Sequence, residues 1–254
     1  MFSVNEQKAI ELGESGEKAV REQNEYDALQ YIEYLRELGE ELLRVDRPEA
    51  DFEKDLKRVA ISLRNIGNKA VQKQIQTVAS NAVEVIGTLA EPSIEKDFSN
   101  ALWSFSKAVQ EIGKGAAQAE MLETGGSAVK TLEMIGKGAV AKKMEVVTLW
   151  TTMSLEEIGY LAGKKQLLDL SNAAKTAREG IIKASEDNGF VTREQIVIYP
   201  QLISQTISEF SDMQNLQPAG YEGSRPNEEF TEEEFFEEEA EEEEPETGTS
   251  GKEK

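Results

Sequence analysis

A motif that occurs five times constrains the fold more than any other feature of this 254-residue sequence. Its fullest form is Leu-x-x-Ile-Gly-x-x-Ala, and its copies centre on Gly67, Gly87, Gly113, Gly136 and Gly159. These glycines are 20, 26, 23 and 23 residues apart, so the mean spacing is 23. Copies that recur at nearly constant spacing indicate a tandem array of one structural unit.

The spacing inside the motif indicates helices. Mostly apolar residues stand eight, four and one positions before each glycine and three positions after it. Residues spaced in this way share one face of an α-helix. Residues 55–183 show no sustained alternation of apolar and polar residues, which is the pattern of a strand. We therefore predict an all-α fold.

The repeated glycine needs a reason, because glycine inside a helix costs about 1 kcal/mol relative to alanine. One interpretation is that the glycine, with the alanine one turn later, lets a neighbouring helix approach closely. Each unit is then a single helix of about 18 residues followed by a turn. The other interpretation is that the glycine ends one short helix and begins another. We favour the first, because the apolar face continues in phase across the glycine.

Short helical units in tandem resemble the α-solenoid class that includes HEAT and armadillo repeats. The resemblance covers about residues 55–183. The unit is shorter than in those families, and the helix-bending proline and the Asp/Arg ladder of HEAT units are missing, so no functional residue is carried over. The resemblance implies a stacked surface of the kind that binds proteins, arranged as a solenoid or as an antiparallel multi-helix array.

Three regions are predicted: an N-terminal helical region at 1–47, a helical repeat domain at 48–217 and a disordered acidic tail at 218–254. Clusters of Gly, Pro, Asp and Ser mark expected breaks, at 45–48, at 91–93 with Ser93 as a helix cap, at 123–127 and at 186–189. A last helix is expected after Pro200, with an apolar face formed by Leu202, Ile203, Ile207 and Phe210.

The chain has no cysteine and no histidine. Disulfides, thiolate nucleophiles, Cys/His zinc sites and imidazole bases are thereby excluded. A carboxylate-based enzyme built on a helical bundle would need Glu-x-x-His, which a chain without histidine cannot supply. We therefore expect a protein that is not an enzyme and has no cofactor.

Acidic residues are concentrated near the C-terminus. The formal net charge is −21, and residues 222–254 contribute 15 acidic and 3 basic residues to it. Residues 62–183, with 13 acidic and 15 basic residues, are close to neutral. Direct nucleic-acid binding is not expected, since phosphate recognition needs a basic surface.

Candidate binding residues lie in both the repeats and the tail. Lysines recur at similar places in the last three repeats, and we interpret them either as a solvated face or as a basic stripe that docks an acidic partner or this protein's own tail. They are Lys114, Lys137, Lys142, Lys143, Lys164 and Lys165. In the tail, Phe230, Phe235 and Phe236 stand among glutamates. The tail is either a solubilising segment or a binding segment, in which the aromatic residues anchor it to a basic partner surface.

Two further motifs suggest ligands only weakly. The strings Gly-Lys-Gly at 113–115 and 136–138 lack the rest of a phosphate loop. The segment 184–195 has the spacing of an EF-hand loop, but Ala184 and Gln195 occupy the positions of its strongest ligands. We expect neither phosphate nor calcium binding.

The sequence favours a non-catalytic protein-binding scaffold that uses the repeat surface and the acidic-aromatic tail. The alternative is an acidic chaperone or nucleic-acid mimic that shields basic partners. Self-association through the Gly/Ala faces of the end repeats is left open. No secretory signal and no apolar run of the roughly 20 residues needed to span a bilayer is visible, so we expect a cytoplasmic protein.

Overall fold

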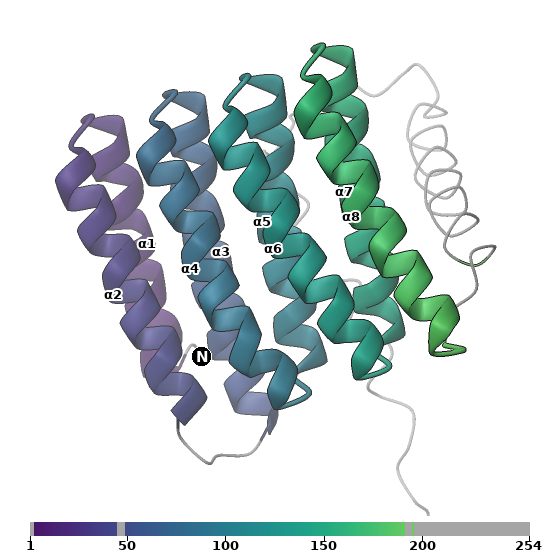
Figure 1. Ribbon diagram of the computed structural model, residues 1–254. Helices are drawn as coiled ribbons and strands as arrows, with labels where there is room; N and C mark the ends of the chain where they lie inside the picture. The colour runs from purple at the N-terminus through teal and green to yellow at the C-terminus, as the bar shows by residue number, and fades with distance from the viewer. Residues whose placement is uncertain (1–2, 45–48, 191–194, 196–254) are drawn as a thin grey trace, which may run out of the picture. The chain divides into compact units, whose positions relative to one another are not determined.

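The computed structural model describes residues 3–44, 49–190 and 195, and these residues form eight α-helices (Figure 1). The helices pack antiparallel in a repeat-like array, which confirms the predicted all-α class. They are α1 (Val4–Arg21), α2 (Glu25–Arg44), α3 (Glu49–Gln72), α4 (Gln76–Glu95), α5 (Ser99–Gln118), α6 (Leu122–Ala141), α7 (Glu145–Lys164) and α8 (Leu168–Asp187). The predicted disordered tail at 218–254 and the predicted helix after Pro200 lie outside the described residues.

The helices form two layers, one of odd-numbered and one of even-numbered helices (Figure 1). Each helix packs against its neighbours along the chain and against the helix two places away. Among the eight described helices, neither α1 nor α2 contacts α7 or α8, so the array does not close into a ring. Helices α1 and α2 continue the layers of the central repeats.

The turns lie at two opposite edges of the array. Turns that follow odd-numbered helices, at 22–24, 73–75, 119–121 and 165–167, lie together at the top of Figure 1. We call this the hairpin edge. The turns that follow α4 and α6, at 96–98 and 142–144, lie at the opposite edge, which we call the crossover edge.

The repeating unit is one helix of 20 residues followed by a three-residue turn. Helices α4 to α8 begin 23 residues apart, so the first interpretation of the motif is confirmed. The middle residue of each described turn has a left-handed backbone, which is usual at helix C-termini. The residues with positive φ are Gln23, Gln74, Asp97, Glu120, Lys143, Gln166 and Gly189.

The alanine of the motif helps to close these turns. Its carbonyl oxygen accepts a hydrogen bond from the last turn residue in four repeats. The N···O distances are 2.8–2.9 Å for Ile75 to Ala70, Met121 to Ala116, Met144 to Ala139 and Leu167 to Ala162. The motif therefore specifies both a packing site and the end of its helix.

Three of the five motif glycines, Gly67, Gly113 and Gly136, closely receive a side chain from the next helix of the same layer. A Cβ atom on Gly67 would lie 2.5 Å from Cδ1 of Ile112, and one on Gly113 would lie 2.7 Å from Cδ1 of Ile158. Leu89 packs in the same way on Gly39, a weaker copy of the motif that lies before the repeat domain predicted at 48–217. The full set is Ile66 on Gly16, Leu89 on Gly39, Ile112 on Gly67, Ile158 on Gly113 and Ile181 on Gly136. The predicted close approach of neighbouring helices is therefore confirmed.

Gly87 differs from Gly67, Gly113 and Gly136. Ala90, not Gly87, lies 23 residues after Gly67 and 23 before Gly113, which explains the irregular spacings of 20 and 26. A Cβ on Gly87 would lie 3.4 Å from Thr131, an ordinary contact. Gly87 is therefore three residues out of register and does not allow a close approach.

Two predicted breaks are wrong. Pro92 lies inside α4, and the hydroxyl of Ser93 donates to the carbonyl oxygen of Leu89 at 2.8 Å instead of capping a new helix. Residues 123–127 lie inside α6, where Gly125 makes room for Leu170, whose Cδ2 would be 2.7 Å from an added Cβ. The break at 186–189 is confirmed, because α8 ends at Asp187 and Gly189 has φ +59°.

The core is a continuous apolar layer between the odd-numbered and even-numbered helices. Its largest buried side chains include Phe105, Leu63 and Leu132, and the last two stand four residues before motif glycines. Within the described residues, no helix is long and apolar enough to cross a membrane.

Candidate functional site

Ion pairs connect successive turns at both edges of the array. Asp97 pairs with Lys142 at 3.0 Å, from the turn after α4 to the turn after α6. Glu120 pairs with Lys165 at 3.4 Å, from the turn after α5 to the turn after α7. In each pair the acid has the left-handed backbone, and the lysine lies 45 residues later. The pair thus occurs at the α4–α6 and α5–α7 junctions, whereas the equivalent positions of the α6–α8 junction carry Lys143 and Asn188.

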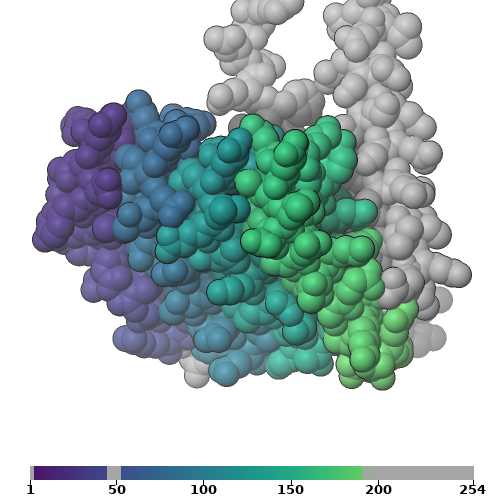
Figure 2. Space-filling model, turned by 45° about the horizontal axis from the view of Figure 1, so that its top comes forward, coloured from purple at the N-terminus to yellow at the C-terminus, as the bar shows by residue number. Residues whose placement is uncertain are grey.

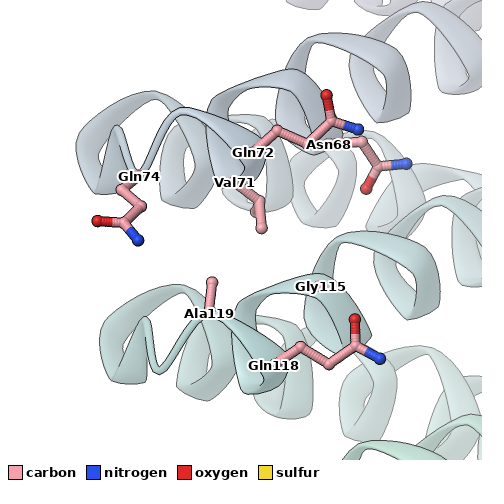
Figure 3. Close-up of a pocket in the computed structure, with 7 residues that line it drawn as sticks. All are labelled: Asn68, Val71, Gln72, Gln74, Gly115, Gln118 and Ala119. Atoms are coloured by element: carbon pink, nitrogen blue, oxygen red, sulfur yellow. The ribbon is translucent and has the colours of Figure 1, made fainter.

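The junction between α3 and α5 carries different residues. The two positions are occupied by Gln74 and Ala119, so the acid and the lysine are both missing. A groove of about 420 Å³ lies there, and Figure 3 shows Val71 of α3 and Ala119 facing each other across it. Its lining residues are Asn68, Val71, Gln72, Gln74, Gly115, Gln118 and Ala119.

Small residues of α5 create this groove. A Cβ on Gly115 would lie 3.1 Å from Cγ1 of Val71, closer than an ordinary contact. In α7 the positions equivalent to Gly115 and Ala119 carry Leu161 and Lys165. A long apolar side chain and a lysine therefore occupy the α5–α7 junction, whereas glycine and alanine leave the α3–α5 junction hollow.

Four carboxamides give the groove its chemistry (Figure 3). The Asn68 amide donates to Oε2 of Glu111 at 3.3 Å, and Oε1 of Gln72 accepts from Nζ of Lys69 at 2.9 Å. Gln74 and Gln118 are exposed to solvent. A carboxamide offers both donors and an acceptor without charge. The lining is thus suited to a neutral ligand that also carries donors and acceptors, such as a peptide main chain.

The six predicted lysines do not form one patch. Lys142 and Lys143 lie at the crossover edge, whereas Lys164 and Lys165 lie at the hairpin edge. The 20 residues of α7 separate these edges by about 30 Å, at 1.5 Å of rise per residue.

Most of these lysines interact with acidic or aromatic neighbours. Lys114 pairs with Glu157 at 3.0 Å, and Lys137 pairs with Glu133 at 2.6 Å. The ammonium of Lys164 lies 4.4 Å from the centre of the Tyr160 ring. Lys142 and Lys165 form the turn pairs, and Lys143 has a left-handed backbone. Phe230, Phe235 and Phe236 lie outside the described residues, so binding by any of these nine residues stays a prediction.

The groove itself was missed in the sequence. A signal for it exists, because acid and lysine recur 45 residues apart at 97 and 142 and again at 120 and 165. The preceding member of this series, 74 and 119, is Gln and Ala. Finding this difference between junctions requires the turn register, which the out-of-register Gly87 obscured.

Other possible ligand sites have little support. In the part of the chain that the structure describes, no group of three acidic side chains is arranged to hold a metal ion. Of the EF-hand-like segment, Ala184 belongs to α8 and residues 191–194 are not described. The pKa of Glu33 is lowered and that of Arg36 is raised, each mainly by the hydrogen bond that Arg36 donates to Glu33 on α2.

Comparisons with known proteins support the architecture alone. No family model and no curated protein matches the chain. A solved structure titled "DHF46 filament" has a TM-score of 0.55 at 14% identity, over 71% of this chain and 98% of that one. "DHF91 filament" has a TM-score of 0.54 at 14% identity, over 70% and 98% of the two chains. At this identity the likeness shows a shared helical-array fold and nothing of function.

Proposed function

We propose that this chain is a non-catalytic protein-binding scaffold and that the α3–α5 groove seats an extended segment of its partner. The observation that carries the proposal is the hollow at the α3–α5 junction, where both turn positions are neutral. At the α4–α6 and α5–α7 junctions an acid and a lysine link the turns, as in Glu120 and Lys165. Between α3 and α5 the chain replaces both with neutral residues and leaves a hollow.

The groove suits a main chain better than it suits a charged group. Its carboxamides carry no net charge, and Arg64 and Glu111 already form an ion pair with each other at 3.4 Å between α3 and α5. Each exposed carboxamide can donate to a carbonyl and accept from an amide of the same extended segment. Val71 packs against Gly115 and gives the floor of the groove an apolar contact for that segment.

The test restores the regular junction. Gln74→Glu with Ala119→Lys introduces the pair found at Glu120 and Lys165, and Glu120 shows that glutamate tolerates the left-handed turn. Peptides selected from a displayed random library on the full chain serve as the probe, and fluorescence anisotropy measures their affinity. We expect the double variant to bind at least about tenfold more weakly, a loss of about 1.4 kcal/mol.

A matched control makes the reverse change at the neighbouring junction. Glu120→Gln with Lys165→Ala removes that ion pair and leaves the α3–α5 groove intact, so peptide affinity should stay within about twofold of the parent (about 0.4 kcal/mol). Equal binding by the groove variant and the parent would show that the groove is not the seat. If the library yields no binding peptide, the protein-binding function itself is refuted.

The acidic tail favours a second candidate function. Fifteen acidic residues in 222–254 suit a chaperone-like role in which the tail shields basic proteins. Deleting 222–254 should then abolish binding to a basic protein such as lysozyme at low salt, yet leave the affinity for groove peptides unchanged. Retention of lysozyme binding after the deletion would refute the shielding role. Both functions fit the expected cytoplasmic location.

A further inference from the structure

Two exposed leucines occupy the same repeat position at the hairpin edge. Leu122 is the first residue of α6 and is 53% exposed, and Leu168 is the first residue of α8 and is 67% exposed. The earlier even-numbered helices begin with Gln76 in α4 and Glu25 in α2. A polar residue is therefore compatible with this position, and the two leucines are not required by the repeat.

The leucines continue the edge that the groove opens onto. Leu122 follows the groove residue Ala119 by three positions, through the turn at 119–121. Leu168 lies on the adjacent helix of the same layer, about 10 Å further along. Figure 2 turns this edge toward the viewer. An extended peptide advances about 3.3 Å per residue, so about three residues lead from one leucine to the next.

The charged residues beside the two leucines indicate which ligand side chains would fit this edge. Each leucine is followed directly by an exposed acidic residue, Glu123 after Leu122 and Asp169 after Leu168. Glu123 accepts a hydrogen bond from the amide of Gln76 at 2.6 Å, which fixes its carboxylate at this edge. Lys164 and Lys165 also lie at this edge, but Lys165 pairs with Glu120 and Lys164 lies over the Tyr160 ring. A ligand that matches the acids beside the leucines therefore presents a large apolar side chain next to a basic one.

We propose that the partner segment seated in the groove continues along the hairpin edge and anchors apolar side chains, flanked by Lys or Arg, on Leu122 and Leu168. This inference rests on the proposed protein-binding function. It adds a sequence preference that main-chain contacts in the groove do not provide. Exposed apolar side chains of this kind often mark interaction sites.

The experiment replaces each leucine with the residue of α4. In Leu122→Gln with Leu168→Gln, both new side chains match Gln76 at the first helix position, so folding should be unaffected. Val146, near the start of α7 at the crossover edge and 56% exposed, supplies the matched control Val146→Gln. The probes are the library peptides and versions of them with every large apolar residue replaced by alanine.

The double leucine variant should bind the parent peptides about tenfold more weakly, or about 1.4 kcal/mol, whereas Val146→Gln should change nothing measurable. The alanine versions should not distinguish the leucine variant from the parent protein, because the side chains that couple to the leucines are absent. Glu123→Gln with Asp169→Asn should weaken binding at low salt and have little effect at high salt.

The outcomes separate this inference from the proposed function. If the groove variant loses peptide binding but the leucine variant binds as the parent does, the groove function stands and the anchoring is refuted. Equal losses from the leucine variant and from Val146→Gln would also refute it. If no peptide depends on the groove, both proposals fail.

Discussion

Ile112 of α5 lies so close to Gly67 of α3 that a single added methyl group would meet it at 2.5 Å. The same relation joins Ile158 to Gly113, where the Cβ of Ala128 would also be only 2.8 Å away. Both isoleucines are fully buried, so neither has space to move aside. The spacing between helices of one layer is set by these glycines.

Gly113→Ala should lower the free energy of unfolding by about 1–3 kcal/mol, because overpacking outweighs the gain in helix propensity. Gly67→Ala should cost less, since no rigid Cβ lies as close to it as Ala128 lies to Gly113. Urea denaturation of the full chain measures both. A neutral Gly113→Ala would contradict the close-packing account.

Gly126 and Gly87 supply the controls for that series. Gly126 lies inside α6 with no other side chain within 4 Å of an added Cβ among the described residues, and Gly87 has only ordinary contacts. Replacing either with alanine should raise the free energy of unfolding by up to about 1 kcal/mol through helix propensity alone. A loss at Gly87 comparable to that at Gly113 would mean that Gly87 also acts as a packing site.

Gln166 should be replaceable by glycine with a gain in stability. Its φ of 59° costs a non-glycine residue about 1–2 kcal/mol, and the greater freedom of glycine in the unfolded chain offsets part of that. We expect Gln166→Gly to raise the free energy of unfolding by about 0.5–1 kcal/mol. The converse change, Gly189→Ala at φ 59°, should lower it. Thermal unfolding of both variants tests this explanation. If the two melting temperatures shifted in the same direction, the explanation would be wrong.

Arg178 occupies a position that is apolar in every other helix. Its counterparts are Leu12, Leu35, Leu63, Ile86, Val109, Leu132 and Leu155. Only 16% of the Arg178 side chain is exposed, and its Nε is buried without a hydrogen-bond partner among the described residues, although the guanidinium pairs with Glu156 at 3.3 Å.

Arg178→Leu should therefore raise the free energy of unfolding by about 1–3 kcal/mol, because it removes a buried unsatisfied donor. Glu156→Gln, which weakens the ion pair and retains the guanidinium, should lower stability slightly. Chemical denaturation distinguishes the two cases. A destabilised Arg178→Leu variant would show that the ion pair outweighs the desolvation of Arg178.

A buried hydroxyl pair links α4 and α6. Oγ of Ser80 lies 2.8 Å from Oγ1 of Thr124, and both residues are buried. Thr124→Val should cost about 1–3 kcal/mol, because it leaves the Ser80 hydroxyl without this partner. Adding Ser80→Ala should restore part of the loss, and a double-mutant cycle would give their coupling energy. Additive effects of the two substitutions would rule out a stabilising role for the hydrogen bond.

The sequence predicts the helices and their packing because the motif combines a 3.6-residue periodicity with a costly, repeated glycine. It does not predict the turns, because residues such as Gln74 and Glu120 adopt the left-handed conformation that glycine usually marks. Pro92 and Gly125, which normally signal breaks, lie inside helices. Gly125 makes room for the side chain of Leu170, which is 45 residues later in the sequence. Local composition cannot reveal such a contact.

The candidate site was harder to predict for the same reason. Lysines such as Lys142 and Lys165 stand out in the sequence, yet in the structure they pair with acids of the preceding turn in the same layer. At the groove, Gln74 and Ala119 stand where the α5–α7 junction has an acid and a lysine. This difference can be recognised only when the register of the turns is known.

The constant 23-residue unit has a consequence for how such a chain can change in length. Removing residues 76–121, two complete units, would join α3 to α6 through an existing turn. In the shortened chain Ile135 would meet Gly39 in place of Leu89, and Ile158 would meet Gly67 in place of Ile112. These contacts within each layer would thus find equivalent partners, whereas the loss of one residue would rotate a whole helix by about 100°. The geometry of the array thus allows the chain to be lengthened or shortened by whole hairpins.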